Sequence, residues 1–77
     1  SKQTYMSTLQ MLDSPDAQIR RAALIALEGF PPEMRMKKTF EMLNDPVKTV
    51  RMEAARQLST FPLDKVDKKR KERLEKT

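Results

Sequence analysis

The sequence predicts an all-α fold in which pairs of helices stack side by side, the architecture of an α-solenoid. The first observation is an internal repeat with a period of 31 residues. The second is that apolar residues recur every three or four positions inside each repeat. The third is composition, because the chain has one glycine and four aromatic residues among 77 and is rich in helix-forming residues. We expect about five helices: two helix pairs and one C-terminal helix.

The repeat aligns residues 9–31 with residues 40–62 without a gap, and eight of the 23 aligned positions are identical. The identical pairs are Met11/Met42, Leu12/Leu43, Pro15/Pro46, Arg20/Arg51, Ala23/Ala54, Leu27/Leu58, Phe30/Phe61 and Pro31/Pro62. The sequence therefore predicts one helix pair in residues 1–31 and a second in residues 32–62. Residues 63–77 are expected to form a charged helix that starts a third unit or links to another module.

Each unit is predicted to run helix, tight turn, helix. Leu9 and Leu12 recur at helical spacing in the first helix of unit 1, as do Phe40 and Leu43 in unit 2. The predicted core face of the second helices consists of Ile19, Ala23, Ala26, Leu27 and Phe30 in unit 1, and of Val47, Val50, Ala54, Leu58 and Phe61 in unit 2.

Local signals set the predicted ends of the second helices. Ser14 and Asp45 are expected to be N-caps, with Pro15 and Pro46 at the first helical position, where a missing amide costs nothing. Gly29 is expected to end the second helix of unit 1 in the left-handed conformation.

Two apolar residues fall outside this pattern. On a helical wheel Leu24 and Ile25 lie opposite the predicted core face, and their equivalents in unit 2 are Ala55 and Arg56. One interpretation is that they pack against an earlier repeat or domain, and the other is that they form a docking patch for a separate partner. The predicted partner-binding residues are Arg21, Leu24, Ile25, Met52 and Arg56.

The runs DSPDAQIRRAALIAL and NDPVKTVRMEAARQL resemble the HEAT repeat over roughly residues 3–62. The resemblance implies a ladder between units made by a turn aspartate and a helix arginine, here Asp45, Arg20 and Arg51, with Ser14 replacing the aspartate of unit 1. It also implies a non-catalytic scaffold or protein-interaction module, a fragment of a larger multidomain protein. Its partners would be neighbouring domains or a separate protein, and we expect the fragment to be monomeric.

The string DPVKTVRMEAARQL, after a GFPP junction, also resembles a segment of large periplasmic multihaem c-type cytochromes. This alternative implies a structural segment of an electron-transfer protein, with haem bound elsewhere in a parent chain and a periplasmic location; otherwise we expect a cytoplasmic one. The haem attachment motif C-x-x-C-H is absent from the chain.

The residue types narrow the chemistry. The chain has neither cysteine nor histidine, so it contains no thiolate nucleophile, no Ser-His or Cys-His pair and no zinc site built on these ligands. No carboxylate pair is placed for acid–base catalysis, and no apolar run is long enough to span a membrane. We therefore expect no enzyme activity, no cofactor within these residues and no membrane insertion.

The positive charge is concentrated towards the C-terminus. Residues 1–31 hold three basic and three acidic residues, residues 32–62 hold six and four, and residues 63–77 hold seven and four, for a net charge of +5. A basic nucleic-acid-binding solenoid is therefore a second alternative. The aromatic residues argue against it, because three of the four belong to predicted core positions and leave no platform for stacked bases.

Overall fold

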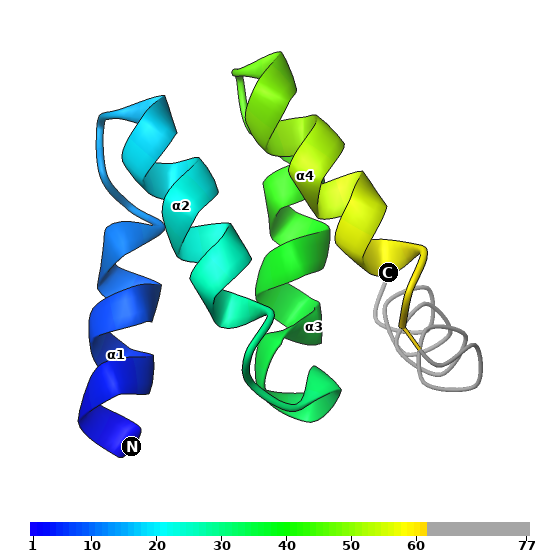
Figure 1. Ribbon diagram of the computed structural model, residues 1–77. Helices are drawn as coiled ribbons and strands as arrows, with labels where there is room; N and C mark the ends of the chain where they lie inside the picture. Colours follow the sequence, from blue (N-terminus) through cyan, green and yellow to red (C-terminus); the bar gives the residue numbers. More distant parts are fainter. Residues whose placement is uncertain (62–77) are drawn as a thin grey trace, which may run out of the picture.

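The computed structural model describes residues 1–61, and the predicted C-terminal helix lies outside these described residues (Figure 1). The helices are α1 (Lys2–Met11), α2 (Ala17–Leu27), α3 (Pro32–Glu41) and α4 (Lys48–Leu58), and a 3₁₀ turn, η1 (Met42–Asn44), continues α3. Residues 1–61 contain no strand. The prediction of an all-α chain built from two helix pairs is confirmed.

The helices form two layers. α1 packs against α2, and α3 packs against α4, which makes the two predicted pairs. The second helices α2 and α4 also contact each other and run side by side, so that they join the two units (Figure 1). This α2–α4 contact is the main connection between the units and decides which residues are buried.

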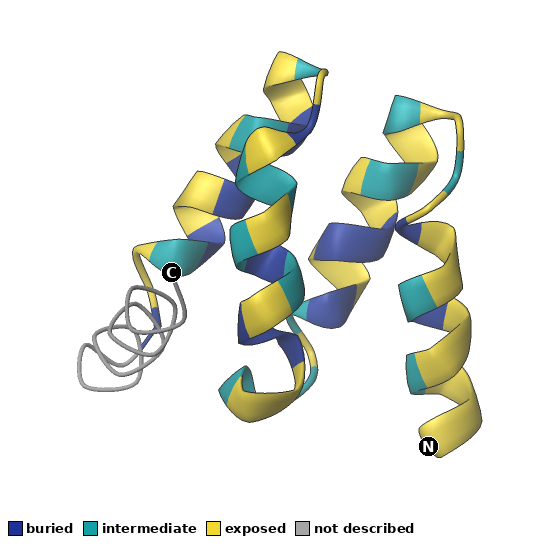
Figure 2. Ribbon diagram, turned by 180° about the vertical axis from the view of Figure 1, so that it is seen from behind, coloured by how far each residue is buried: buried dark blue, intermediate teal, exposed yellow. Residues whose placement is uncertain are grey.

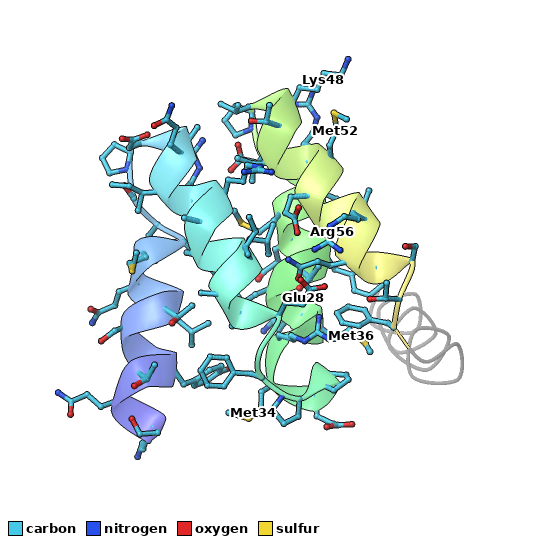
Figure 3. The ribbon with its side chains drawn as sticks, in the orientation of Figure 1. Glu28, Met34, Met36, Lys48, Met52 and Arg56 are labelled. Atoms are coloured by element: carbon cyan, nitrogen blue, oxygen red, sulfur yellow. The ribbon has the colours of Figure 1, made fainter. Side chains whose placement is uncertain are left out.

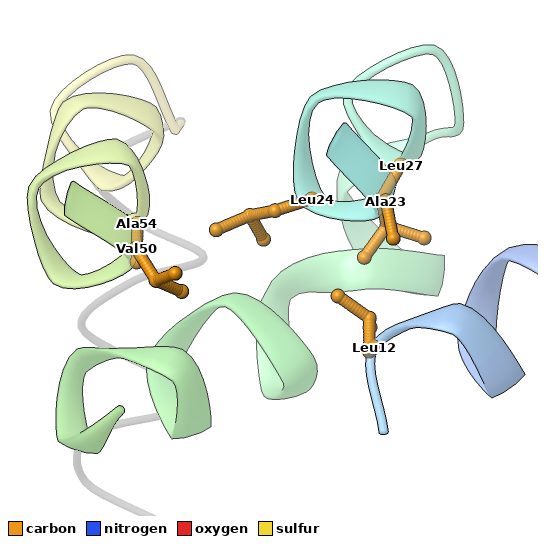
Figure 4. Packing of buried hydrophobic residues seen from close by; sticks show 6 residues of the cluster. All are labelled: Leu12, Ala23, Leu24, Leu27, Val50 and Ala54. Carbon is orange, nitrogen blue, oxygen red and sulfur yellow. The ribbon is translucent and has the colours of Figure 1, made fainter. Parts of the chain in front are cut away.

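The core lies between the two layers. Leu12 from the end of α1 packs below Ala23 and Leu27 of α2, while Leu24 reaches from α2 towards α4 (Figure 4). The buried cluster consists of Leu12, Ala23, Leu24, Leu27, Val50 and Ala54. Full burial of one leucine side chain contributes about 2 to 3 kcal/mol, which is a large share of the stability of so small a domain.

Aromatic and guanidinium groups fasten the α2–α3 turn. The rings of Tyr5 and Phe30 meet edge to face with their centroids 5.2 Å apart, and the Tyr5 hydroxyl donates to the Met34 carbonyl. The Arg35 Nε donates to the Phe30 carbonyl at 2.9 Å, and its guanidinium carbon lies 4.5 Å from the centre of the Phe61 ring. Burial lowers the pKa of Arg35.

The predicted start of α2 was two residues too early. The helix begins at Ala17, and its N-cap is Asp16, whose Oδ1 accepts the amide of Gln18 at 2.8 Å. Ser14 instead accepts the amide of Asp16 through its hydroxyl at 3.1 Å, and Pro15 lies in the turn ahead of the helix. The side chain of Ser14 therefore shapes the turn and does not cap the helix.

The predicted start of α4 was early by the same amount. The helix begins at Lys48 after Val47, and Asp45 accepts the amide of Val47 through Oδ1 at 2.9 Å. Pro46 lies in the turn, as Pro15 does. Both turns therefore use the polar side chain at the same repeat position for a bond to the amide two residues on.

The prediction for Gly29 was also wrong. No residue in the described part of the chain has a positive φ, so Gly29 is not a left-handed cap. α2 ends instead with a tightened turn, in which the amides of Glu28 and Gly29 donate to the carbonyls of Ile25 and Ala26 at 3.1 and 3.2 Å.

The burial of α2 differs from the predicted core face at three positions. Ile19 is 39% exposed and Ala26 is also exposed, although both were assigned to the core. Leu24 is completely buried, although it was placed outside the core, whereas Ile25 is exposed as expected. The physical reason is that α2 contacts α4 as well as α1. Because α4 covers Leu24, the buried side of α2 is centred closer to Leu24 than to Ile19.

Candidate protein-interaction surface

The turn carboxylate of unit 2 holds the two units together. Arg20 donates through Nε and Nη2 to Asp45 Oδ2 and Oδ1 at 2.8 and 3.0 Å, a two-pronged pair across the α2–α4 contact. The Asp45 side chain is almost fully buried. The hydrogen bond from the Arg20 guanidinium lowers the pKa of Asp45, and Asp45 in turn raises the pKa of Arg20.

The Arg20 guanidinium also binds backbone carbonyls of the turn that precedes α2. Arg20 Nη1 donates to the carbonyls of Ser14 and Pro15 at 2.9 and 3.1 Å. The equivalent residue of unit 2, Arg51, donates through Nη1 to the carbonyl of Asp45 at 2.8 Å. The structure thus brings together Arg20, Asp45 and Arg51, and each arginine binds the backbone at the same position of its own unit.

A second connection lies near the other end of the α2–α4 contact. Gln57 is completely buried, and its Nε2 donates to the carbonyl of Leu24 at 2.9 Å and to Glu53 Oε2 at 2.8 Å. The Leu24 carbonyl belongs to the last turn of α2, where a helix leaves carbonyl groups without an amide of its own. An amide side chain of unit 2 therefore completes the end of a helix of unit 1.

Arg56 extends this connection to the surface. Its Nη2 donates to Glu53 Oε2 at 2.6 Å and to Glu28 Oε1 at 2.8 Å, which joins α4 to the end of α2 (Figure 3). The hydrogen bonds that Arg56 donates to Glu53 and, to a smaller extent, to Glu28 raise the pKa of Arg56. The bonds that Glu53 accepts, first from Arg56 and then from Gln57, lower the pKa of Glu53. The sequence analysis did not predict this network. The one feature that could have indicated it is the spacing of Glu53 and Gln57, two polar residues four positions apart that flank the small residues Ala54 and Ala55.

Four of the five predicted partner-binding residues share one exposed surface. Arg21 and Ile25 of α2 are repeat equivalents of Met52 and Arg56 of α4, so the two adjacent helices present them at matching heights. Ile25 is 41% exposed and Met52 is 59% exposed. We call Arg21, Ile25, Met52 and Arg56 the B face. The fifth residue, Leu24, does not belong to it, because it is buried between the helices and unavailable to a partner.

A family model for HEAT repeats matches residues 6–76 of the chain. The chain belongs to the HEAT-repeat family. HEAT repeats generally mediate protein interaction or scaffolding, and the family is typically non-enzymatic. Searches of curated proteins and of solved structures find no match to the chain. The HEAT resemblance seen in the sequence is confirmed, and these comparisons give no support to the resemblance to multihaem cytochromes.

Residues 1–61 were compared with the requirements of a metal site and of a membrane span. Within residues 1–61, no cluster of three or more acidic, cysteine or histidine residues is arranged to hold a metal ion. The same residues include no helix that is long and apolar enough to cross a membrane.

Proposed function

We propose that this chain is a non-catalytic HEAT-repeat interaction module that binds a protein segment across the B face. The observation that carries the proposal is the pairing of exposed apolar and guanidinium groups on two adjacent helices. Arg21 and Met52 occupy the same repeat position on the adjacent helices α2 and α4, as do Ile25 and Arg56, and all four residues are exposed. Arginine, methionine and large apolar residues of this kind are favoured in the centres of protein interfaces.

The B face is held in a fixed arrangement before any partner arrives. The Arg20–Asp45 pair fastens α2 to α4 at one end of their contact, and the Gln57–Leu24 bond fastens them near the other end. The spacing between the two helices is thus set by buried hydrogen bonds. A preorganised surface loses little conformational freedom on binding, which favours affinity.

The charges of the B face indicate a partner with carboxylates. Within the described residues the Arg21 side chain makes no hydrogen bond, although it lies near enough to Glu53 to help lower the pKa of that carboxyl. Arg56 is half-exposed while it holds Glu28 and Glu53. The partner we propose is an amphipathic helix that covers Ile25 and Met52 with apolar side chains and places a carboxylate near Arg21.

The engagement of the arginines disfavours the nucleic-acid alternative. Four of the five arginines within residues 1–61 donate hydrogen bonds to protein groups. The rings of Tyr5 and Phe30 pack on each other, and Phe61 is covered by Arg35, so neither site offers a free platform for bases. The chain has no histidine or cysteine with which to build a catalytic or cofactor site of the usual kinds.

A peptide selection tests this proposal. A random library of helical peptides displayed on phage is selected on the whole chain, and the affinities of the selected peptides are measured by fluorescence anisotropy. We expect Met52→Ser and Ile25→Ser each to weaken binding by roughly tenfold or more, as for central residues of an interface. Arg21→Glu should weaken most the peptides that contain acidic residues.

The matched control is Met6→Ser, which removes a similarly exposed apolar side chain from α1. Met6 is 48% exposed and lies on the other helix layer, so its replacement should change affinity by less than about twofold if the B face is the site. Selected peptides that bind all of these variants equally well would disprove the B face as the binding surface.

A further inference from the structure

The six methionines of the chain divide between the buried and the exposed positions that alternate along its helices (Figure 2). Met36 is 2% exposed, and Met42 is half-buried against the core. The other four are exposed, and Met52 of the B face is the most exposed of them at 59%. The chain has no cysteine, so these open thioethers are the sulfur groups that an oxidant meets first.

The fold does not require an apolar residue at position 52. Met52 lies outside the core cluster, and its equivalent in unit 1 is Arg21, which is charged and exposed. On α4, Met52 lies between Lys48, one turn before it, and Arg56, one turn after it (Figure 3). A polar group on the Met52 side chain should therefore change the surface of α4 and leave the α2–α4 contact intact.

We propose that Met52 is a redox-sensitive modification site, and that its oxidation to the sulfoxide releases a partner from the B face. This inference rests on the proposed function, in which the partner covers Met52 with apolar side chains. In the oxidation the thioether sulfur takes one oxygen atom from hydrogen peroxide. The O–O bond breaks, an S–O bond forms, and the second oxygen leaves as water with both protons. The sulfur loses two electrons and the peroxide gains them.

The sulfoxide oxygen changes the balance between the free and the bound chain. In the free chain water satisfies this new hydrogen-bond acceptor, and Lys48 and Arg56, one turn away on either side, carry N–H donors. Beneath the apolar side chains of a partner, the same oxygen is buried without a donor, which costs free energy. Oxidation therefore disfavours the complex, and reduction of the sulfoxide by a dithiol restores the apolar surface.

Peroxide treatment of the whole chain, followed by a binding measurement, tests the proposal. The probe is a peptide selected on the B face that contains neither methionine nor cysteine, and catalase removes the peroxide before the peptide is added. Mass spectrometry of proteolytic fragments measures the sulfoxide at each methionine, and fluorescence anisotropy measures the affinity for the peptide. The peroxide dose is kept low enough that the urea midpoint of unfolding does not change.

We expect Met52 to be oxidised while Met36 stays reduced, and the affinity for the peptide to fall by roughly tenfold or more. Methionine sulfoxide reductase with a dithiol should restore the affinity. Met52→Leu keeps an apolar side chain of similar volume without sulfur, so it should bind within about threefold of the unchanged chain and lose nothing further after peroxide. Met6→Leu removes a thioether that is 48% exposed on the other helix layer and should leave the response to peroxide unchanged.

Two results overturn the proposal and leave the proposed function standing. One is full affinity in a chain whose Met52 is oxidised, although Met52→Ser weakens the binding of the same peptide. The other is an equal loss of affinity after peroxide in Met52→Leu, which would place the sensitive group elsewhere. Failure of the proposed function gives a different result, because Met52→Ser and Ile25→Ser then bind the peptide as well as the unchanged chain before any oxidant is added, and the redox site is overturned with it.

Discussion

The helices α2 and α4 occupy the same position in two copies of one repeat, yet they bury different sides. α4 buries Val50, Glu53 and Gln57 towards α2, whereas α2 buries Leu24 towards α4 and leaves Ile19 exposed. The difference shows that a second helix of this repeat has two potential neighbour sides besides the side towards its own first helix. Which neighbour side is covered depends on the place of the unit in the stack.

The two helices also contribute different groups to their contact. The apolar centre is formed by Leu24 from α2 and Val50 from α4. Near the ends, unit 2 supplies the buried polar side chains Asp45 and Gln57, while unit 1 supplies the arginine and the backbone carbonyl that satisfy them. Each of these two side chains also has a partner in its own unit, but a shift of the neighbouring unit would break the hydrogen bonds that cross the contact, so these bonds favour one register of the two units.

The largest expected change in stability is at Leu24, and it contrasts with a small change at the adjacent Ile25. Leu24→Ala removes a completely buried side chain from the α2–α4 contact and should lower the free energy of unfolding by about 3 kcal/mol. Ile25→Ala removes a side chain that is 41% exposed and should cost about 0.5 kcal/mol or less. Urea unfolding followed by far-ultraviolet circular dichroism measures both variants.

The same two variants test whether Leu24 belongs to the core and Ile25 to the B face. Ile25→Ala should retain the unfolding stability of the chain while it weakens binding of peptides selected on the B face. A Leu24→Ala variant as stable as the unchanged chain would mean that α2 and α4 do not pack as described, and that Leu24 belongs with Ile25 on the docking surface.

The next largest effect is expected at Asp45. Asp45→Ala leaves the Arg20 guanidinium without its carboxylate and the Val47 amide without its acceptor, which should cost about 2 kcal/mol. Asp45→Asn should cost less, because its amide oxygen can still accept from Val47. The control is Ser14→Ala at the equivalent position of unit 1, where only the bond to the Asp16 amide is lost. Equal losses at Asp45 and Ser14 would show that the pair with Arg20 adds nothing to the stability of the contact.

Acid should weaken the contact through the same carboxylate. The pKa of Asp45 is lowered in the folded chain by Arg20, and that of Glu53 by Arg56. A lowered carboxyl pKa contributes stability above the unfolded values, about 3.9 for Asp and 4.3 for Glu, and this stability is lost as the pH falls through the folded values below them. The urea midpoint should therefore hold between about pH 7 and pH 5 and fall below about pH 4.

The Asp45→Asn variant shows how much of this pH dependence comes from Asp45. It has no carboxyl at the shared turn, so its urea midpoint should fall less steeply below about pH 4 than that of the unchanged chain. Parallel curves for the two proteins would assign the acid sensitivity to other carboxyls, such as Glu53.

The sequence predicted the repeat, the helix pairs and much of the core because each depends on local periodicity. It predicted the burial of Val50, Ala54 and Leu27 correctly. It failed at Leu24 and Ile19, because a helical wheel with a single buried face cannot include a second helix packed at its side. The partners of Gln57 and Arg56 were also out of reach, since they lie in the other unit and no short-range pattern identifies them.

The sequence predicted the exposure of the B-face residues, while their role in binding stays a prediction. Arg21, Ile25 and Met52 are exposed as expected. Leu24 and Ile25 were grouped because they are adjacent and lie outside the periodic pattern, and the structure separates them because adjacent residues on a helix point about 100° apart. Pattern alone therefore identified the unusual segment of α2 and could not say which of its residues faces a neighbour.

The smallest expected effect concerns the ends of the same two helices and has the opposite sign. Gly29 has no positive φ, and a Cβ added there would lie 3.5 Å from the Ala26 carbonyl oxygen, an ordinary contact. At the equivalent position of unit 2, Thr60 already makes the same backbone bond, to the Gln57 carbonyl at 3.0 Å. Gly29→Ala should therefore raise the free energy of unfolding by about 0.5 kcal/mol, because it restricts the unfolded chain. A loss of stability measured by urea unfolding would instead show that α2 needs the left-handed cap that the sequence suggested.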